Sequence, residues 1–172
     1  MKLKYTLLLT LFLSLGAFTS CDDDDDEDIE YTATYPISGD WVVTLNLETA
    51  PGQFEPLIEP TEVLIYNTSA NIPTEVWVDD EGHIWGFKVK TPINIDNLTF
   101  GGENLENMYY NSQVTITDGQ VFLNAVEVNN LMRDSIYFKV SFSDDTDAEG
   151  NPDPFGTTYH VYGHRKTGFE FE

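Results

Sequence analysis

Few side chains in this sequence have the types and the spacing that catalysis or metal binding requires. His160 and His164 lie four residues apart in a segment with the alternation of a β-strand. A strand rises about 3.3 Å per residue, so the two imidazoles lie roughly 13 Å apart along it, too far to ligate one metal ion. The sequence also lacks the Gly-x-Ser-x-Gly string of a nucleophile elbow. We predict structural or surface roles for both histidines, with no catalytic residue, no metal ligand and no cofactor, and whether the protein is an enzyme stays open.

One acidic loop has part of the pattern of a calcium site. From Asp145 to Gly150, acids occupy positions one, three and five and a glycine occupies position six, as in an EF-hand. Position twelve needs a bidentate glutamate, but the residue there is Gly156. The EF-hand interpretation therefore fails, and the segment 144–155 is either a solvated loop or a weak calcium contact.

The first twenty residues have the features of an export signal. Lys2 and Lys4 precede the apolar run 7–15, which is too short to span a bilayer as a permanent helix. The string 18–21 then resembles a bacterial lipobox that ends at Cys21, the one cysteine of the chain. We predict a signal peptide at 1–20 and lipidation of Cys21, where several acyl chains would give a stable anchor. The alternative is a plain signal peptide followed by a free thiol.

Seven consecutive acids follow the cysteine, from Asp22 to Asp28. Such a run repels itself and stays extended, so we interpret 21–34 as the lipidated cysteine and an acidic tether. The run also resembles the acidic signal that directs some Gram-negative lipoproteins to the outer face of the outer membrane. We therefore expect a lipid-anchored protein of the outer membrane, exposed at the cell surface.

The charge of the chain excludes one class of partner. The whole sequence has 8 basic and 30 acidic residues, for a net charge of -22. From Ile29 onward, 23 acids stand against 6 bases, which leaves -17. Because phosphate backbones would be repelled by most of this surface, we predict no nucleic-acid partner.

The remaining chain, 35–172, has the pattern of a single all-β domain. Short segments rich in β-branched and aromatic residues alternate with turn residues, and no window keeps helical periodicity. Asp118-Gly119 is the strongest hairpin signal. We predict an antiparallel, up-and-down barrel of about eight strands, with a β-sandwich as the alternative. The expected strands lie near 37–47, 62–67, 75–78, 83–90, 93–100, 112–117, 121–128, 135–142 and 157–165.

Several strings together resemble a known family. Gly39-Asp40-Trp41 is similar to the Gly-x-Trp signature that opens lipocalin and other calycin barrels. With the strings at 114–121, 134–138 and 158–169, the chain resembles the bacterial lipoprotein family of lipid-binding putative hydrolases, whose members look like calycin-type barrels. The resemblance implies that Trp41 closes one barrel end and that Arg165 stacks across it, a contact worth ~0.5–2 kcal/mol. An alternative role for Arg165 is to bind an anionic ligand.

Aromatic residues are the candidates for ligand contact. Trp85, Phe87, Phe138 and Phe142 fall on the apolar phase of their expected strands. They either pack the core or, in a hollow barrel, line an apolar pocket. A second group falls outside this phase and could stack on sugar rings: Trp77, Tyr109 and Tyr110.

We therefore predict a surface lipoprotein that binds a small apolar or amphipathic, lipid-like molecule inside its barrel. One alternative is a glycan-binding or structural accessory of an outer-membrane uptake system, which would have an outer-membrane protein as its partner. A hydrolase, as the family name suggests, is the third.

Overall fold

The computed structural model describes residues 30–168. The expected signal peptide, Cys21 and the acidic run 22–28 lie outside this range. A compact unit begins at Tyr31 and contains all the strands. Among the described residues there is no helix of the length and apolarity needed to cross a membrane.

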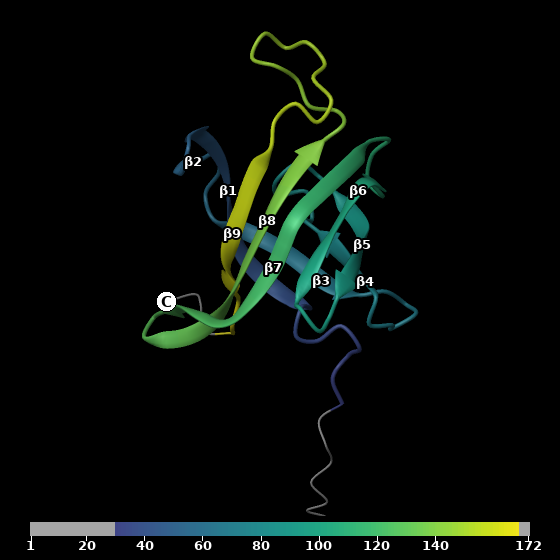
Figure 1. The fold of residues 1–172 in the computed structure, drawn as a ribbon, viewed down its shortest axis with the longest axis vertical. Coiled ribbons are helices and arrows are strands. Elements are labelled where there is room, and N and C mark those ends of the chain that lie inside the picture. The colour runs from purple at the N-terminus through teal and green to yellow at the C-terminus, as the bar shows by residue number, and fades with distance from the viewer. Residues whose placement is uncertain (1–29, 169–172) are drawn as a thin grey trace, which may run out of the picture. The chain divides into compact units, whose positions relative to one another are not determined.

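The secondary structure of residues 30–168 consists of strands that follow one another around a single antiparallel sheet (Figure 1). The first and last strands also pair with each other, through seven residue pairs from Trp41↔Arg165 to Leu47↔Tyr159. This pairing closes the sheet. The strands are β1 (Gly39–Ala50), β2 (Gln53–Pro56), β3 (Thr61–Asn67), β4 (Glu75–Asp79), β5 (Lys88–Asn94), β6 (Thr99–Glu106), β7 (Gln113–Val128), β8 (Leu131–Phe142) and β9 (Tyr159–Arg165).

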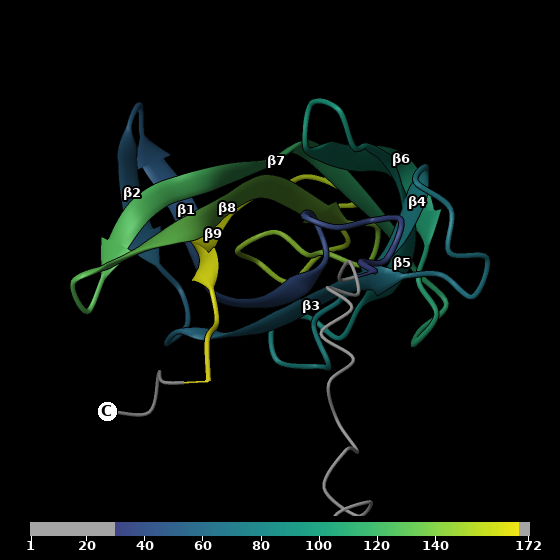
Figure 2. The same ribbon diagram turned by 90° about the horizontal axis from the view of Figure 1, so that it is seen from below.

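Strand β2 is additional to the closed barrel. It pairs with the end of β1, from Asn46 to Ala50, whereas β3 pairs with the start of β1, from Gly39 to Val43. Because β9 pairs with β1 across both stretches, β2 and β3 must share the opposite edge of β1. The barrel proper therefore has eight strands, β1 and β3 to β9 (Figure 2). The prediction of an up-and-down antiparallel barrel is confirmed, and the sandwich alternative is wrong.

The core follows from the alternation of side chains along each strand. In β1, Trp41, Val43 and Leu45 point inward and are buried, and Val42 and Thr44 point outward. The same alternation in the other strands brings valines, isoleucines and phenylalanines to the interior, and together they form one cluster.

The expected hairpin at Asp118-Gly119 is wrong. Strand β7 runs through both residues, and the register against β8 shifts between Thr117 and Gln120, which marks a β-bulge. Asp118 takes the left-handed conformation with φ of 55°, and a Cβ on Gly119 would overlap a carbonyl oxygen of β6. Asp118 therefore uses at a bulge the left-handed conformation that a hairpin turn also uses, and Gly119 permits the close approach of β6.

The actual turn between β7 and β8 is Asn129-Asn130, with φ values of 52° and 62°. Two consecutive left-handed residues are typical of a two-residue hairpin turn, and asparagine tolerates this conformation well.

Two other expected strands are displaced. The segment 83–90 contributes only its end to β5, because residues 80–87 form a loop around the buried Asp80. The Asp80 carboxylate accepts hydrogen bonds from five backbone N–H groups, those of Gly82, Ile84, Trp85, Gly86 and Phe87. The segment 93–100 is not one strand: it holds the end of β5, a turn and the start of β6, and the two strand ends pair with each other.

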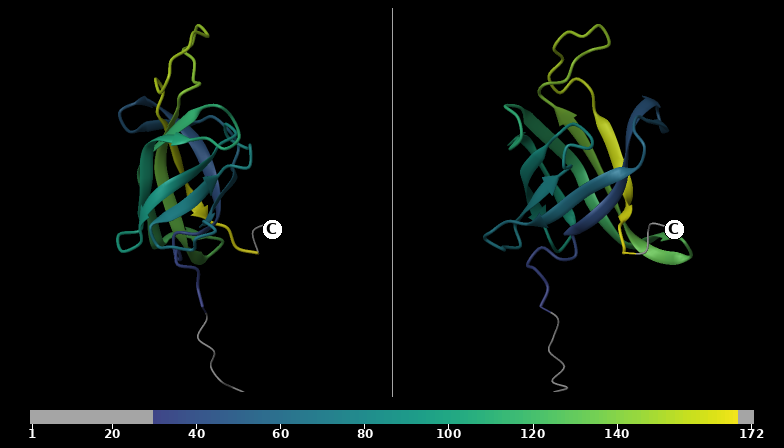
Figure 3. Two further views of the ribbon diagram at one scale, coloured as in Figure 1. Left: turned by 90° about the vertical axis from the view of Figure 1, so that its right-hand side faces the viewer. Right: turned by 180° about the vertical axis from the view of Figure 1, so that it is seen from behind.

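The two ends of the barrel differ. The long loop between β8 and β9 lies at one end, and the entry segment 31–38 and the β7–β8 turn lie at the other (Figure 3). Arg165 ties the second end together, because its guanidinium donates to the carbonyl oxygens of Pro36 and Ser38 and to Asp134.

Candidate ligand-binding groove

The aromatic residues predicted to line a pocket form a packed interior. Three of them are fully buried: Phe87, Phe138 and Phe142. Trp85 stacks on Phe142 with ring centroids 4.5 Å apart and planes within 4°. A ligand could reach the three phenylalanines only if they separated, whereas Trp85 is partly exposed and its indole N–H donates to Asp144. The role of these four side chains in binding stays a prediction.

The signature residues meet at the barrel end. The Arg165 guanidinium lies 4.3 Å from the centroid of the Trp41 ring, and Trp41 is fully buried. Gly39 leaves room for this arrangement, since a Cβ there would overlap the guanidinium. Arg165 also forms an ion pair with Asp134 at 2.9 Å. Because its nitrogen atoms are occupied by these partners, the geometry favours closure of the barrel end over binding of an anionic ligand.

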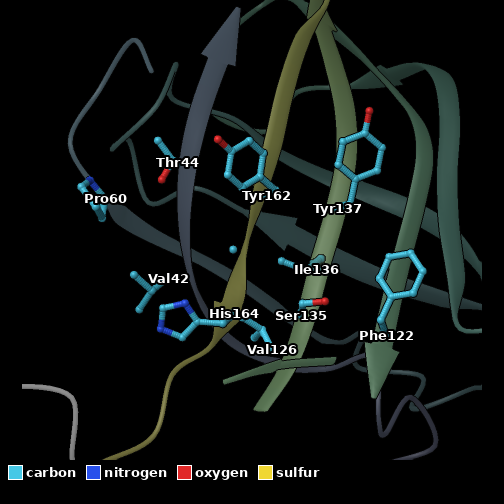
Figure 4. Close-up of a pocket in the computed structure, with 11 residues that line it drawn as sticks. Val42, Thr44, Pro60, Phe122, Val126, Ser135, Ile136, Tyr137, Tyr162 and His164 are labelled. Carbon is cyan, nitrogen blue, oxygen red and sulfur yellow. The ribbon is translucent and has the colours of Figure 1, made fainter. Parts of the chain in front are cut away.

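An accessible hollow lies on the outer face of the barrel instead. Its volume is about 460 Å³. The floor consists of outward-facing residues of β1, β8 and β9, and side chains from the β7–β8 ribbon and the segment before β3 form the two sides. Figure 4 shows the rings of Tyr162 and Tyr137 between Pro60 on one side and Phe122 on the other. The lining residues are Val42, Thr44, Pro60, Phe122, Val126, Ser135, Ile136, Tyr137, Tyr162, Gly163 and His164.

A second hollow of about 530 Å³ continues from the first. The two share Thr44, Pro60 and Tyr162, and the second extends along the segment 56–59. We call the combined surface the outer groove. Its size falls in the range of ~300–1,000 Å³ that is common for small-molecule sites.

Polar groups gather along one side of the outer groove. The Tyr162 hydroxyl donates to the side-chain oxygen of the buried Asn46 at 3.2 Å. The Tyr137 hydroxyl lies 2.9 Å from Nδ1 of His160, and Nε2 of the same ring lies 3.7 Å from a carboxylate oxygen of Glu48. Burial raises the pKa of Tyr137, so its hydroxyl stays protonated at neutral pH. A molecule in the groove would meet an apolar floor and, beside it, these hydroxyl groups.

The sequence analysis missed this groove. Tyr162 and Phe122 are both about half exposed, and strand alternation alone marks them as solvent-facing. The available signal was the presence of large apolar side chains at outward positions of β1, β7 and β9, such as Val42.

The histidines do not form a shared site. His160 is buried beneath Phe54, with ring centroids 4.8 Å apart. His164 lies four residues further along β9 and lines the groove. The described residues contain no group of three His, Cys, Asp or Glu side chains placed to hold a metal ion. In the loop 144–155, the Asp147 carboxylate accepts hydrogen bonds from the backbone of Glu149 and Asn151.

The aromatics considered for sugar stacking have other partners. Two ammonium groups lie near the Trp77 ring, with Lys88 at 5.4 Å and Lys90 at 5.5 Å from its centroid. Tyr109 donates to the nearly buried Asp79 at 2.7 Å, and this bond together with burial raises the pKa of Tyr109. Stacking on a sugar at Trp77 would have to displace the lysines.

Fold and groove define the protein as an antiparallel β-barrel with an apolar, partly hydroxylated surface site. The chain matches the family described as lipid-binding putative hydrolase over residues 26–170. It therefore belongs to this family, and the resemblance found in the sequence is confirmed. A search of curated proteins finds no match.

Proposed function

We propose that this protein is a lipid-anchored protein of the outer-membrane surface that binds an amphipathic, lipid-like molecule in the outer groove. The observation that carries the proposal is the accessible apolar floor of the groove beside the hydroxyls of Tyr137 and Tyr162. The family's lipid-binding description supports the class of ligand. The packed interior favours the outer groove over the barrel lumen as the place of binding.

The electrostatics of the domain favour particular head groups. From Ile29 onward the net charge is -17, so an anionic head group would be repelled at low ionic strength. A neutral or zwitterionic head group would not be repelled, and it could accept hydrogen bonds from the hydroxyls of Thr44 and Ser135 while its chain covered Val42 and Phe122. We therefore expect single-chain zwitterionic lipids to bind better than free fatty acids of equal length.

Calorimetric titration with a chain-length series of such lipids, below their micelle concentrations, tests the proposal. Full burial is worth ~0.8 kcal/mol per methylene. The groove is open on one side, so about half of that, or roughly a two-fold gain in affinity per methylene, is expected.

Four variants locate the site. Phe122→Glu and Tyr162→Glu place charges in the groove, and each should weaken binding at least about ten-fold, because an unpaired charge would have to be desolvated. Tyr110→Glu changes an exposed aromatic outside the groove and should have no effect. Phe138→Leu changes the barrel interior. If Phe138→Leu weakens binding and the two groove variants do not, the ligand binds inside the barrel and the proposed site is wrong.

A further inference from the structure

One part of the sheet extends beyond the barrel. Strand β6 pairs with β7 only as far as Gln120, and β9 pairs with β8 only from Ser135 onward. Between these limits β7 and β8 pair with each other alone, through Val126↔Arg133, Glu127↔Met132 and Val128↔Leu131. We call residues 122–133 the arm. It extends past β9 in Figures 1 and 2.

The arm exposes large apolar side chains. Phe122, Leu123, Leu131 and Met132 are 47%, 48%, 58% and 56% exposed. A two-stranded ribbon has no third strand and no core beneath it, so it needs another surface to bury its apolar residues.

The charge of the arm differs from that of the domain. It contains one acid, Glu127, and one base, Arg133, so its net charge is zero while the domain carries -17. The loop at the opposite end has five acids between Asp144 and Asp153. The uncharged arm can therefore approach lipid head groups with less repulsion than the acidic loop at the opposite end.

The chain also enters the domain at this end. Asp134 accepts from the Asn124 amide at the base of the arm and from Arg165, and Arg165 in turn donates to Pro36 of the entry segment. Tyr31 and Tyr35 in that segment are exposed and stack with ring centroids 4.1 Å apart. Tyrosine is enriched where proteins meet the head-group region of a bilayer.

From these observations we infer that the arm docks on the surface of a lipid bilayer, with Leu131 and Met132 in the head-group and upper acyl region. Phe122 and Val126 of the arm also line the outer groove, so docking places the groove beside the lipid from which a ligand would enter. The inference rests on the proposed function in one respect, the anchor at Cys21. Eight residues lie between Cys21 and Glu30, so the fully extended chain from the cysteine to Glu30 spans at most about 30 Å.

Photolabelling tests the inference. The full chain, purified from the membrane fraction, is reconstituted into phosphatidylcholine vesicles that contain a phospholipid with a diazirine in its acyl chain, and labelled peptides are mapped by mass spectrometry. We expect roughly ten-fold more label in residues 122–133 than in 106–112 or 144–155, because only groups that reach the acyl region react.

Two double variants make the test specific. Leu131→Ser with Met132→Ser should lower the label in the arm at least about five-fold. Met108→Ser with Tyr110→Ser changes two side chains of similar exposure, 57% and 61%, on the β6–β7 loop at the opposite end, and should leave the labelling unchanged. All four side chains are exposed, so far-UV circular dichroism and the thermal midpoint should match those of the unaltered chain.

Three results would overturn the inference: absence of label in the arm, equal label at both ends, or no effect of the arm variant. Light scattering, which measures the oligomeric state, tests whether a second copy of the chain covers the arm instead of a bilayer. If the arm variant converts a dimer into a monomer while labelling is unchanged, a second copy of the chain covers the arm. Failure of the anchor or of the groove is read separately, by fatty-acid labelling of Cys21 and by the lipid titration without vesicles.

Discussion

Arg165 should contribute far more to stability than one ring contact. Its guanidinium covers Trp41 at 4.3 Å, pairs with Asp134 at 2.9 Å and donates to the carbonyl oxygens of Ser38 and Pro36. The side chain is only 21% exposed and that of Asp134 only 19%. Arg165→Ala removes these contacts together and leaves Asp134 and two carbonyl groups without this donor.

The expected loss can be estimated from its parts. The ring contact is worth ~0.5–2 kcal/mol, and hydrogen bonds to a charged group ~1.5–3 kcal/mol each before non-additivity is considered. Removing one partner of a buried ion pair costs ~3–5 kcal/mol. Because this pair is partly solvated, we expect a loss of about 3 kcal/mol from a domain stability of ~5–15 kcal/mol.

Urea unfolding followed by tryptophan fluorescence measures this loss. With a slope near 2 kcal/mol per molar urea, the midpoint should fall by about 1.5 M. Arg165→Lys keeps the charge without the planar fork, so it should lose roughly half as much. Lys166→Ala is the matched control: its ion pair with Glu62 is more exposed on the acid side and should be worth at most about 1 kcal/mol. If Arg165→Ala loses no more than Lys166→Ala, the guanidinium does not hold the barrel end together.

Three further changes test other parts of the molecule. Trp41→Ala should lower the free energy of unfolding by ~3–5 kcal/mol in a thermal melt, and a loss below 1 kcal/mol would place the ring outside the core. Burial raises the pKa of Asp79, but hydrogen bonds from Tyr109 and other donors outweigh it and the pKa is lowered. This stability is present above the ordinary pKa of ~3.9 and is lost as pH falls through the folded value, so Tyr109→Phe should unfold at higher pH in an acid titration and Tyr110→Phe should not. Cys21→Ala should abolish fatty-acid labelling and release the protein from membranes, and an unlabelled wild type would contradict the anchor.

The class of fold was predictable because the alternation of side chains along each strand agrees with the side that the strand turns to the barrel interior. Trp41, Val43 and Leu45 alternate with the outward-facing Val42 and Thr44, and all three are buried in the structure. The pairing of β1 with β9 depends on residues more than a hundred positions apart, which no local pattern reports. The similarity of Gly39 and Trp41 to a known signature supplied that long-range information, and it also indicated Arg165 as the partner.

The positions of turns were less predictable. Asp118-Gly119 and Asn129-Asn130 are both pairs that tolerate left-handed backbone, and each could form a hairpin turn. Register decides between them, because Ile116 and Val121 both point into the core on either side of the bulge. A turn at Asp118-Gly119 would have removed one of these residues from its neighbours in β8. Likewise, the segment 83–90 has the pattern of a strand, in which its backbone N–H groups would bond to a neighbouring strand. In the structure the Asp80 carboxylate accepts hydrogen bonds from several of these N–H groups instead.

The location of the groove has a simple physical reason that sequence analysis can use. Eight strands enclose an interior just wide enough for side chains, so large inward residues such as Phe138 and Phe142 fill the space that a ligand would occupy. Inward aromatics therefore predict packing, and outward apolar residues predict accessible surface. Val42 and Tyr162 are on neighbouring strands of the outer face. Phe122 reaches the same surface by the alternation of β7, whereas Val126 lies beyond a second register shift of that strand. The apolar floor could be inferred from alternation, but its side wall depends on a bulge that only the folded sheet defines.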